Sequence, residues 1–127
     1  MEMKFYRCSH CGQIIAIVKE TGVPVICCGE PMVLLEANTV DAAFEKHIPV
    51  VEEKENVVQV RVGEVIHPMT NEHYIEFIVL HTDQGYKIKH LYPGDVPAAE
   101  FAIKENEIVF SAYAYCNLHG LWKKNIE

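Results

Sequence analysis

The sequence predicts a mainly β protein in which a small metal-stapled unit precedes an antiparallel β-sandwich. Four of the five cysteines fall before residue 29, which marks a short segment that depends on bound metal for its stability. The later chain alternates apolar and polar residues over short runs, which is typical of half-buried strands. Turn residues separate these runs at regular intervals. The one helical signal is a single turn at 41–44.

Composition and charge argue against several classes of protein and of binding partner. The chain has 127 residues, of which 50 % are hydrophobic and 23 % charged, with a formal net charge of −7. It is too apolar for a disordered protein, and no stretch approaches the ~18 apolar residues of a membrane span. An acidic total without a block of Lys or Arg argues against nucleic-acid binding. No signal peptide is visible at residues 1–4, so we expect a cytoplasmic protein.

The first domain is expected at residues 1–36 and the second at 37–127. In the first, β-branched residues predict a strand at 14–18, and a turn at 21–22 separates it from a second short strand. Another turn at 29–31 leads into an apolar run at 32–35. A piece this short rarely holds a core unaided.

The second domain is expected to contain about seven short strands. Val58, Val60 and Val62 alternate with polar residues, which predicts a strand with one buried face. Residues 74–80 are apolar on both faces except at Glu76, which favours a central strand.

Turns divide the rest of this domain into further strands. A hairpin turn at 83–85 is expected to lead into a strand at 86–90, and residues 93–95 turn the chain again. In the last apolar run, we expect Ile108, Phe110, Ala112 and Ala114 to share one face.

The first candidate metal site consists of Cys8, Cys11, Cys27 and Cys28. Four soft thiolates suit tetrahedral zinc or mononuclear iron, and the spacing alone leaves a structural zinc site open. Neighbouring side chains in a strand point to opposite faces. Cys27 and Cys28 can therefore reach one ion only if the backbone turns sharply, which Gly29 would permit.

The second candidate site combines one thiol with several imidazoles. Cys116 and His119 lie three positions apart after a probable strand, and further histidines occupy inter-strand loops at His47, His67 and His73. Structural zinc closes its shell at four ligands, whereas five such donors suit iron with one coordination position open. Outside this group, His10, His81 and His90 are expected to be solvated or structural.

Four motifs together resemble those of the desulfoferrodoxin family, the two-iron superoxide reductases. They are Cys-x-x-Cys with Cys-Cys at the front, Glu-Lys-His-x-Pro at 45–49, His-Pro-Met-x-x-x-His at 67–73 and Cys-Asn-x-His-Gly at 116–120. The match spans the whole chain in the right order. The second and fourth motifs are specific, whereas Cys-x-x-Cys alone would not be.

The resemblance implies a desulforedoxin-like domain at 1–36, followed by an immunoglobulin-like, neelaredoxin-like sandwich at 37–127 that carries the catalytic iron. It implies two mononuclear non-haem irons per chain. Iron centre I would be bound by Cys8, Cys11, Cys27 and Cys28. Iron centre II would have His47, His67, His73 and His119 as equatorial ligands and Cys116 as the axial one. The backbone N–H groups of Leu118 and His119 are placed to hydrogen-bond that axial sulfur.

The implied reaction is the one-electron reduction of superoxide to hydrogen peroxide, without dismutation to dioxygen. Superoxide would enter opposite Cys116. Lys46 would supply positive charge and order a water for proton delivery, and Glu45 would approach the iron once it is ferric and displace peroxide. The resemblance also implies a rubredoxin-type electron donor and a homodimer.

Three other functions compete with this interpretation. In a plain electron carrier neither iron would meet superoxide, but such a protein has no need of the Glu45–Lys46 pair beside His47. In a zinc-stapled binding module the histidines would be incidental. A superoxide dismutase would also need efficient oxidation of superoxide by the ferric state.

Overall fold

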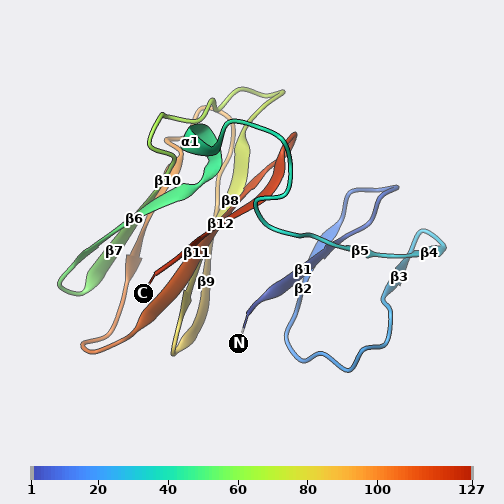
Figure 1. Cartoon of the computed structure of the whole chain (residues 1–127), viewed down its shortest axis with the longest axis horizontal. Coiled ribbons are helices and arrows are strands. Elements are labelled where there is room, and N and C mark those ends of the chain that lie inside the picture. Colours follow the sequence, from blue (N-terminus) through green and yellow to red (C-terminus); the bar gives the residue numbers. More distant parts are fainter. Residues whose placement is uncertain (1, 127) are drawn as a thin grey trace. The chain divides into compact units, whose positions relative to one another are not determined.

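A computed structural model of the chain describes residues 2–126 and consists mainly of β-strands joined by turns (Figure 1). The mainly β prediction is therefore confirmed. Two compact units divide the chain, Met1–Glu36 and Ala37–Glu127. Among the described residues, no helix is long and apolar enough to cross a membrane.

The first unit is built from five short strands. Its main sheet has the order β2-β1-β5, and the remaining two strands pair with each other. The bounds are β1 (Lys4–Arg7), β2 (Ile14–Ile17), β3 (Ile26–Cys27), β4 (Glu30–Pro31) and β5 (Val33–Leu34). Within residues 2–36, only Phe5, Cys8 and Met32 are buried, so apolar packing alone supplies little stability here.

The second unit is a sandwich of two antiparallel sheets. One has the order β10-β7-β6 and the other β12-β11-β8-β9, which confirms the expected seven strands. The bounds are β6 (Pro49–Lys54), β7 (Val57–Val62), β8 (Ile75–Thr82), β9 (Gly85–His90), β10 (Ala98–Ala102), β11 (Val109–Cys116) and β12 (Gly120–Asn125). A single helical turn, α1 (Phe44–His47), precedes β6.

The core lies between the two sheets and follows the predicted alternation. Val58, Val60 and Val62 of β7 are at most 1 % exposed. They belong to one buried cluster with Ile78 of β8 and Ala112 of β11. These inward-facing residues give the second unit a hydrophobic core of its own.

Two local expectations were wrong. Ile108 and Phe110 do not share the buried face of Ala112, because β11 changes register against β8 between Val109 and Ser111. Such a bulge turns the chain over locally, so Val109 is buried and Phe110 is 41 % exposed. The helical turn lies at Phe44–His47 rather than at 41–44.

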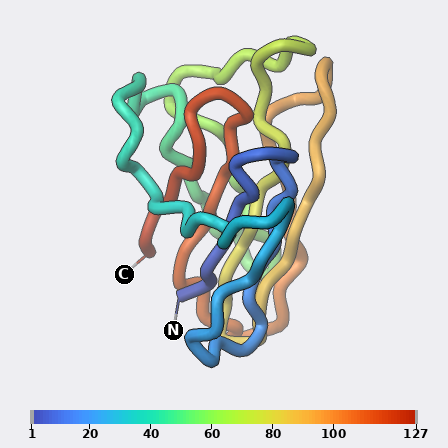
Figure 2. The backbone as a smooth tube through the Cα atoms, turned by 90° about the vertical axis from the view of Figure 1, so that its right-hand side faces the viewer, coloured from blue at the N-terminus to red at the C-terminus, as the bar shows by residue number. Residues whose placement is uncertain are grey.

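Three segments far apart in the sequence meet at one end of the sandwich. They are α1, the loop at 63–74 and the turn between β11 and β12, which lie together in both views (Figures 1 and 2). All of the histidines expected to bind the second metal belong to these segments. The fold thus brings the predicted site residues to one place.

The loop before β11 generates a prediction about pH. The Glu107 carboxylate accepts hydrogen bonds from Thr82 Oγ1 and from the Lys104 N–H at 2.8 Å. These bonds, the Thr82 bond above all, lower the pKa of Glu107 below its usual 4.5. A lowered carboxyl pKa stabilises the fold above the unfolded-state pKa, and this contribution disappears as the pH falls through the folded-state pKa.

Replacing Glu107 by Gln should therefore lower the free energy of unfolding at pH 7. The difference from the wild type should shrink as the pH falls below 4.5. Urea titrations at several pH values measure this, with exposed Glu105→Gln as the control. A Glu107→Gln effect that is constant across this range would contradict the prediction.

Candidate metal centres

Five donor residues in the second unit come from the three clustered segments. His47 ends α1, His67 and His73 lie in the 63–74 loop, Cys116 ends β11 and His119 precedes β12. His47, His67 and Cys116 are at most 2 % exposed. His73 and His119 are partly exposed, so the predicted residues meet at the edge of the core, with one side open to solvent.

Their donor atoms converge. The Nε2 atom of His47 is 3.2 Å from Nε2 of His67 and 3.1 Å from Nδ1 of His119. Donor atoms of His47, His67, His73 and Cys116 all lie within 4.8 Å of one another. His119 is not in this four-residue group, but its Nδ1 lies beside it, 3.8 Å from the Sγ atom of Cys116.

The four imidazoles form a cycle in the order His47, His67, His73, His119. Ring centroids of neighbours in this cycle are 4.6 to 5.1 Å apart, and neighbouring rings are close to perpendicular. Across the cycle, the His47 and His73 centroids are 6.4 Å apart. Four nitrogens can therefore surround one central position.

Backbone carbonyls determine which nitrogen of two rings carries the proton. The Nδ1 atoms of His47 and His67 lie 2.6 and 2.7 Å from the carbonyl oxygens of Ala43 and Pro68. A carbonyl only accepts, so each Nδ1 donates a proton and each Nε2 presents a lone pair.

The two lone pairs of His47 and His67 face each other at 3.2 Å, which is unfavourable unless a cation lies between them. The buried Nε2 of His73 has no hydrogen-bond partner within residues 2–126. Both observations fit a metal ion, because neutral imidazoles held by backbone carbonyls are ordinary metal ligands.

Burial favours the neutral form of three of the imidazoles, those of His47, His67 and His73. It lowers the pKa of His67 to about 4, and it is also the largest cause of the lowered pKa values of His47 and His73. Burial raises the pKa of the Cys116 thiol, while the N–H groups of Leu118 and His119 lower it. The expected hydrogen bonds to this sulfur are thus present, and metal binding would release the thiol proton.

The sequence motifs contained Asn117 without indicating its role. Its Oδ1 accepts from the Tyr74 N–H at 2.9 Å, and its Nδ2 donates to the Glu72 carbonyl at 3.0 Å. Asn117 therefore fastens the turn that bears His119 to the loop that bears His73.

Gly63 is a second residue whose role the sequence did not indicate. A Cβ atom at this position would lie 2.7 Å from the Glu45 carbonyl oxygen and 3.0 Å from that of Ile48. These are backbone atoms, which cannot yield as a flexible side chain can. Only glycine therefore lets the 63–74 loop approach α1 so closely.

Lys46 and Glu45 occupy different surroundings. Both are exposed. The charge of Lys46 reaches the histidines, since it adds to burial and to His119 in lowering the pKa of His73. The carboxylate of Glu45 is not among the clustered donor atoms of the described residues.

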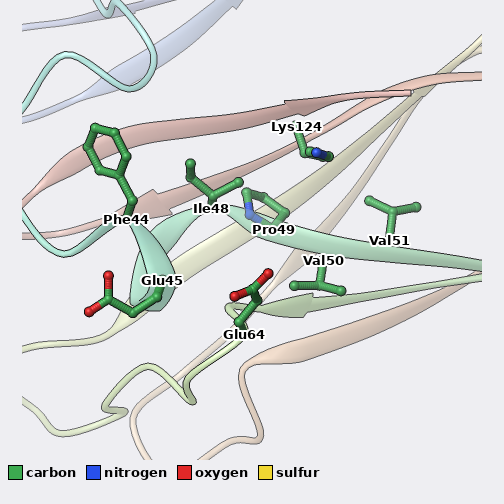
Figure 3. A pocket seen from close by; sticks show the side chains of 8 residues that line it. All are labelled: Phe44, Glu45, Ile48, Pro49, Val50, Val51, Glu64 and Lys124. Atoms are coloured by element: carbon green, nitrogen blue, oxygen red, sulfur yellow. The ribbon is translucent and has the colours of Figure 1, made fainter. Parts of the chain in front are cut away.

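Glu45 instead lines a groove of about 530 Å³ beside α1 and the start of β6. Phe44 and Glu45 project from α1 in different directions (Figure 3). The other lining residues are Ile48, Pro49, Val50, Val51, Glu64 and Lys124. The structure thus separates Glu45 from the histidine cycle.

The first unit contains the four-cysteine group. The four Sγ atoms lie within 4.8 Å of one another, and those of Cys11 and Cys27 are 3.7 Å apart. Cys28 and Gly29 both have left-handed backbones, with φ of 53° and 78°. This confirms the expected sharp turn, which lets adjacent cysteines face one ion.

The thiols of Cys8 and Cys27 differ widely in pKa. The Cys11 N–H, which donates to the Cys8 sulfur, is the main cause that lowers the pKa of Cys8 to about 6. Hydrogen bonds with Cys8 and Cys11 raise the pKa of Cys27 to about 12. Complete deprotonation therefore needs a bound cation to offset the accumulated charge.

The remaining histidines lie outside both groups, as expected. His10 is exposed, with its Nε2 3.1 Å from a Glu30 carboxylate oxygen. His81 stacks on Tyr86 with ring centroids 4.3 Å apart, and His90 is exposed on β9.

Comparison with protein families gives matches over both units. The family model described as desulfoferrodoxin matches residues 39–125, and that of the desulfoferrodoxin N-terminal domain matches residues 1–35. The chain belongs to the desulfoferrodoxin family. The family and the two donor groups together indicate two iron sites in the chain.

Individual relatives agree with this membership. Desulfoferrodoxin of Nitratidesulfovibrio vulgaris is 48 % identical over 122 residues, which is 96 % of this chain and 95 % of the relative. The superoxide reductase structure from Treponema pallidum superimposes with a TM-score of 0.83 at 39 % identity, over 98 % of this chain and all of that one. The one-iron superoxide reductase from Giardia intestinalis has a TM-score of 0.56 at 36 % identity and covers 65 % of this chain and 98 % of its own.

The separation of the two donor groups into two units yields a prediction. Cys11→Ser should remove one ligand of the four-cysteine group and leave the five donors of the second unit intact. Iron per chain should fall from about two to about one, and the first unit should lose stability, because metal binding and folding are coupled. Metal analysis and the ferric spectrum measure this.

The matched control is His10→Ala, which replaces an exposed residue between two of the cysteines. It should retain both irons. Loss of both irons from Cys11→Ser would contradict independent sites.

Proposed function

We propose that this chain is a superoxide reductase that converts superoxide to hydrogen peroxide by one-electron reduction, without dismutation to dioxygen. The observation that carries the proposal is the cycle of four imidazoles with the Cys116 sulfur beside it. Five donors leave one position of a six-coordinate iron open. Family membership and the superoxide reductases among the relatives support the same reaction.

We assign the metal-binding residues by unit. The domain at 1–36 would hold iron through Cys8, Cys11, Cys27 and Cys28, and the domain at 37–127 through His47, His67, His73, His119 and Cys116. A ferrous ion in the second site supplies the single electron. Burial favours the neutral form of His47, His67 and His73, and backbone N–H groups hydrogen-bond the Cys116 sulfur.

Capture of superoxide depends on local charge. The whole chain carries −7, which repels an anion at long range. Ferrous iron with one thiolate and four neutral imidazoles carries about +1, and the Lys46 ammonium adds a second positive charge. We assign to Lys46 Nζ the attraction of superoxide and the ordering of a water that delivers protons.

Glu45 is assigned to the oxidised state. In the structure it lines the groove beside α1, so its carboxylate must move to reach the histidine cycle. We propose that the Glu45 carboxylate would move toward iron held by the histidines and Cys116 once that iron is oxidised, and that it would displace the peroxide product. The assignment rests on its place beside Lys46 and His47 in the motif.

Three further assignments complete the proposal. The first unit exposes large apolar side chains, among them Val18 at 100 % and Val23 at 75 %, which supports a homodimer that the native mass in solution would reveal. A rubredoxin-type protein would supply the electron. The five cysteines of the described residues are all free thiols, which supports a reducing, cytoplasmic setting.

A stopped-flow experiment tests the reaction. Reduced protein mixed with superoxide should form one peroxide for each superoxide consumed, with oxidation of the second iron. Dismutation would yield one peroxide for every two superoxides, with release of dioxygen. An electron carrier would show no rapid superoxide-dependent oxidation, and either result would overturn the proposal.

Replacing Lys46 by Ala should slow the second-order reaction with superoxide by about 10-fold or more, because it removes the local positive charge. The dependence on ionic strength should flatten, while the visible spectrum stays unchanged. Stopped-flow rates over a series of salt concentrations measure both.

Glu45→Ala is the matched control, since it removes the adjacent exposed charge of opposite sign. It should capture superoxide at a nearly normal rate but alter the ferric spectrum. An unchanged rate in Lys46→Ala, or an unchanged ferric spectrum in Glu45→Ala, would contradict the corresponding role.

A further inference from the structure

Trp122 of β12 contacts two histidines of the second metal site. Its ring stacks on the His47 imidazole, with centroids 4.8 Å apart and planes 27° from parallel. Its Nε1–H donates a hydrogen bond to the His119 carbonyl oxygen at 3.1 Å. One side chain thus joins residues that are 72 positions apart in the sequence.

The environment of Trp122 differs from that of an ordinary core residue. It is 0 % exposed, yet it is not part of the buried cluster between the sheets. Besides His47, the aromatic ring that it meets among the described residues is that of Phe44, at 5.4 Å and 67°. Trp122 therefore packs against the first and last residues of α1.

The helical turn α1, which bears His47, needs packing contacts to be stable. A helix of one turn is not stable by itself, and α1 has no side-chain hydrogen bond at its N-cap. The Ala43 carbonyl restrains one edge of the His47 ring through a hydrogen bond, and packing against the face of the ring restrains it further. The large flat face of Trp122 provides that packing.

His119 is held by a hydrogen bond to its backbone rather than by stacking of its ring on Trp122. It lies in the short turn between β11 and β12, beside Leu118, which is 59 % exposed. The bond from Trp122 orients the peptide that joins His119 to Gly120. The two N–H groups that reach the Cys116 sulfur belong to the same turn, so Trp122 steadies both the His119 ring and these donors.

We infer that Trp122 is a positioning residue of the second iron site, which holds His47 by stacking and the His119 turn by its hydrogen bond. The inference rests on the proposed assignment of these histidines as ligands. Trp122 offers no lone pair to a metal ion, because its indole Nε1–H is a donor and is bonded to the His119 carbonyl. It acts by fixing the relative positions of His47 and His119, two ligands that come from separate segments.

Two substitutions separate the two contacts. Trp122→Phe keeps a stacking ring but loses the N–H donor, and Trp122→Leu loses both. Residues that orient metal ligands typically contribute about 10–100-fold to metal affinity. Trp122→Leu should therefore release iron to a chelator about 10–100-fold faster from the second site, with a smaller acceleration in Trp122→Phe.

The four-cysteine group and a buried aromatic residue of the other sheet serve as controls. Iron in the four-cysteine group should be released at the wild-type rate in every variant. Phe101→Leu removes a buried aromatic ring from β10, in the other sheet, and should leave both release rates unchanged. The ferric EPR signal of the second site should shift in Trp122→Phe, because loss of the bond to His119 alters the ligand turn, whereas Phe101→Leu should not shift it.

Equal acceleration in Trp122→Leu and Phe101→Leu would overturn the inference, because Trp122 would then contribute only general stability. Should Trp122→Leu fail to fold, Trp122→Phe decides: wild-type iron release with a wild-type ferric EPR signal overturns the inference. Iron release and EPR do not depend on superoxide. The iron-release and EPR results can therefore be interpreted even if the protein does not reduce superoxide. Likewise, the superoxide experiment can be interpreted even if Trp122 has no positioning role.

Discussion

The second site depends on one electrostatic constraint, the meeting of two imidazole lone pairs. The carbonyls of Ala43 and Pro68 each take the Nδ1 proton of a histidine, which leaves the Nε2 atoms of His47 and His67 facing each other at 3.2 Å. Protonation could relieve the repulsion, but burial opposes it by lowering both pKa values. A cation bound by both Nε2 atoms removes the repulsion without the cost of protonating a buried imidazole.

The β-sandwich makes this constraint possible, because it supplies burial and fixed spacing at one end. Cys116 ends β11 in the same buried cluster as Ala112 and Ala114. The strand thus delivers a sulfur to the edge of the core, where the loop at 63–74 and α1 close over it. Polar contacts such as those of Asn117 then connect these segments across the site.

The sequence predicted the donor residues because metal ligation requires specific side chains at short spacings, as in Cys116 and His119. It also predicted β7, where Val58, Val60 and Val62 alternate with polar residues. It could not predict the bulge near Val109, which depends on how β11 pairs with β8. The roles of Gly63 and Trp122 likewise depend on contacts with α1, which is distant from both in sequence.

The two units depend on metal to different degrees. The second has a continuous core between two sheets. The one-iron superoxide reductase from Giardia intestinalis matches 65 % of this chain over 98 % of its own length. Residues 2–36 bury only Phe5, Cys8 and Met32, and one of these belongs to the four-cysteine group. Metal in the first unit therefore replaces a missing core, whether or not it also carries electrons. In the second unit, the core forms the site, and the metal satisfies donors that the fold has already placed.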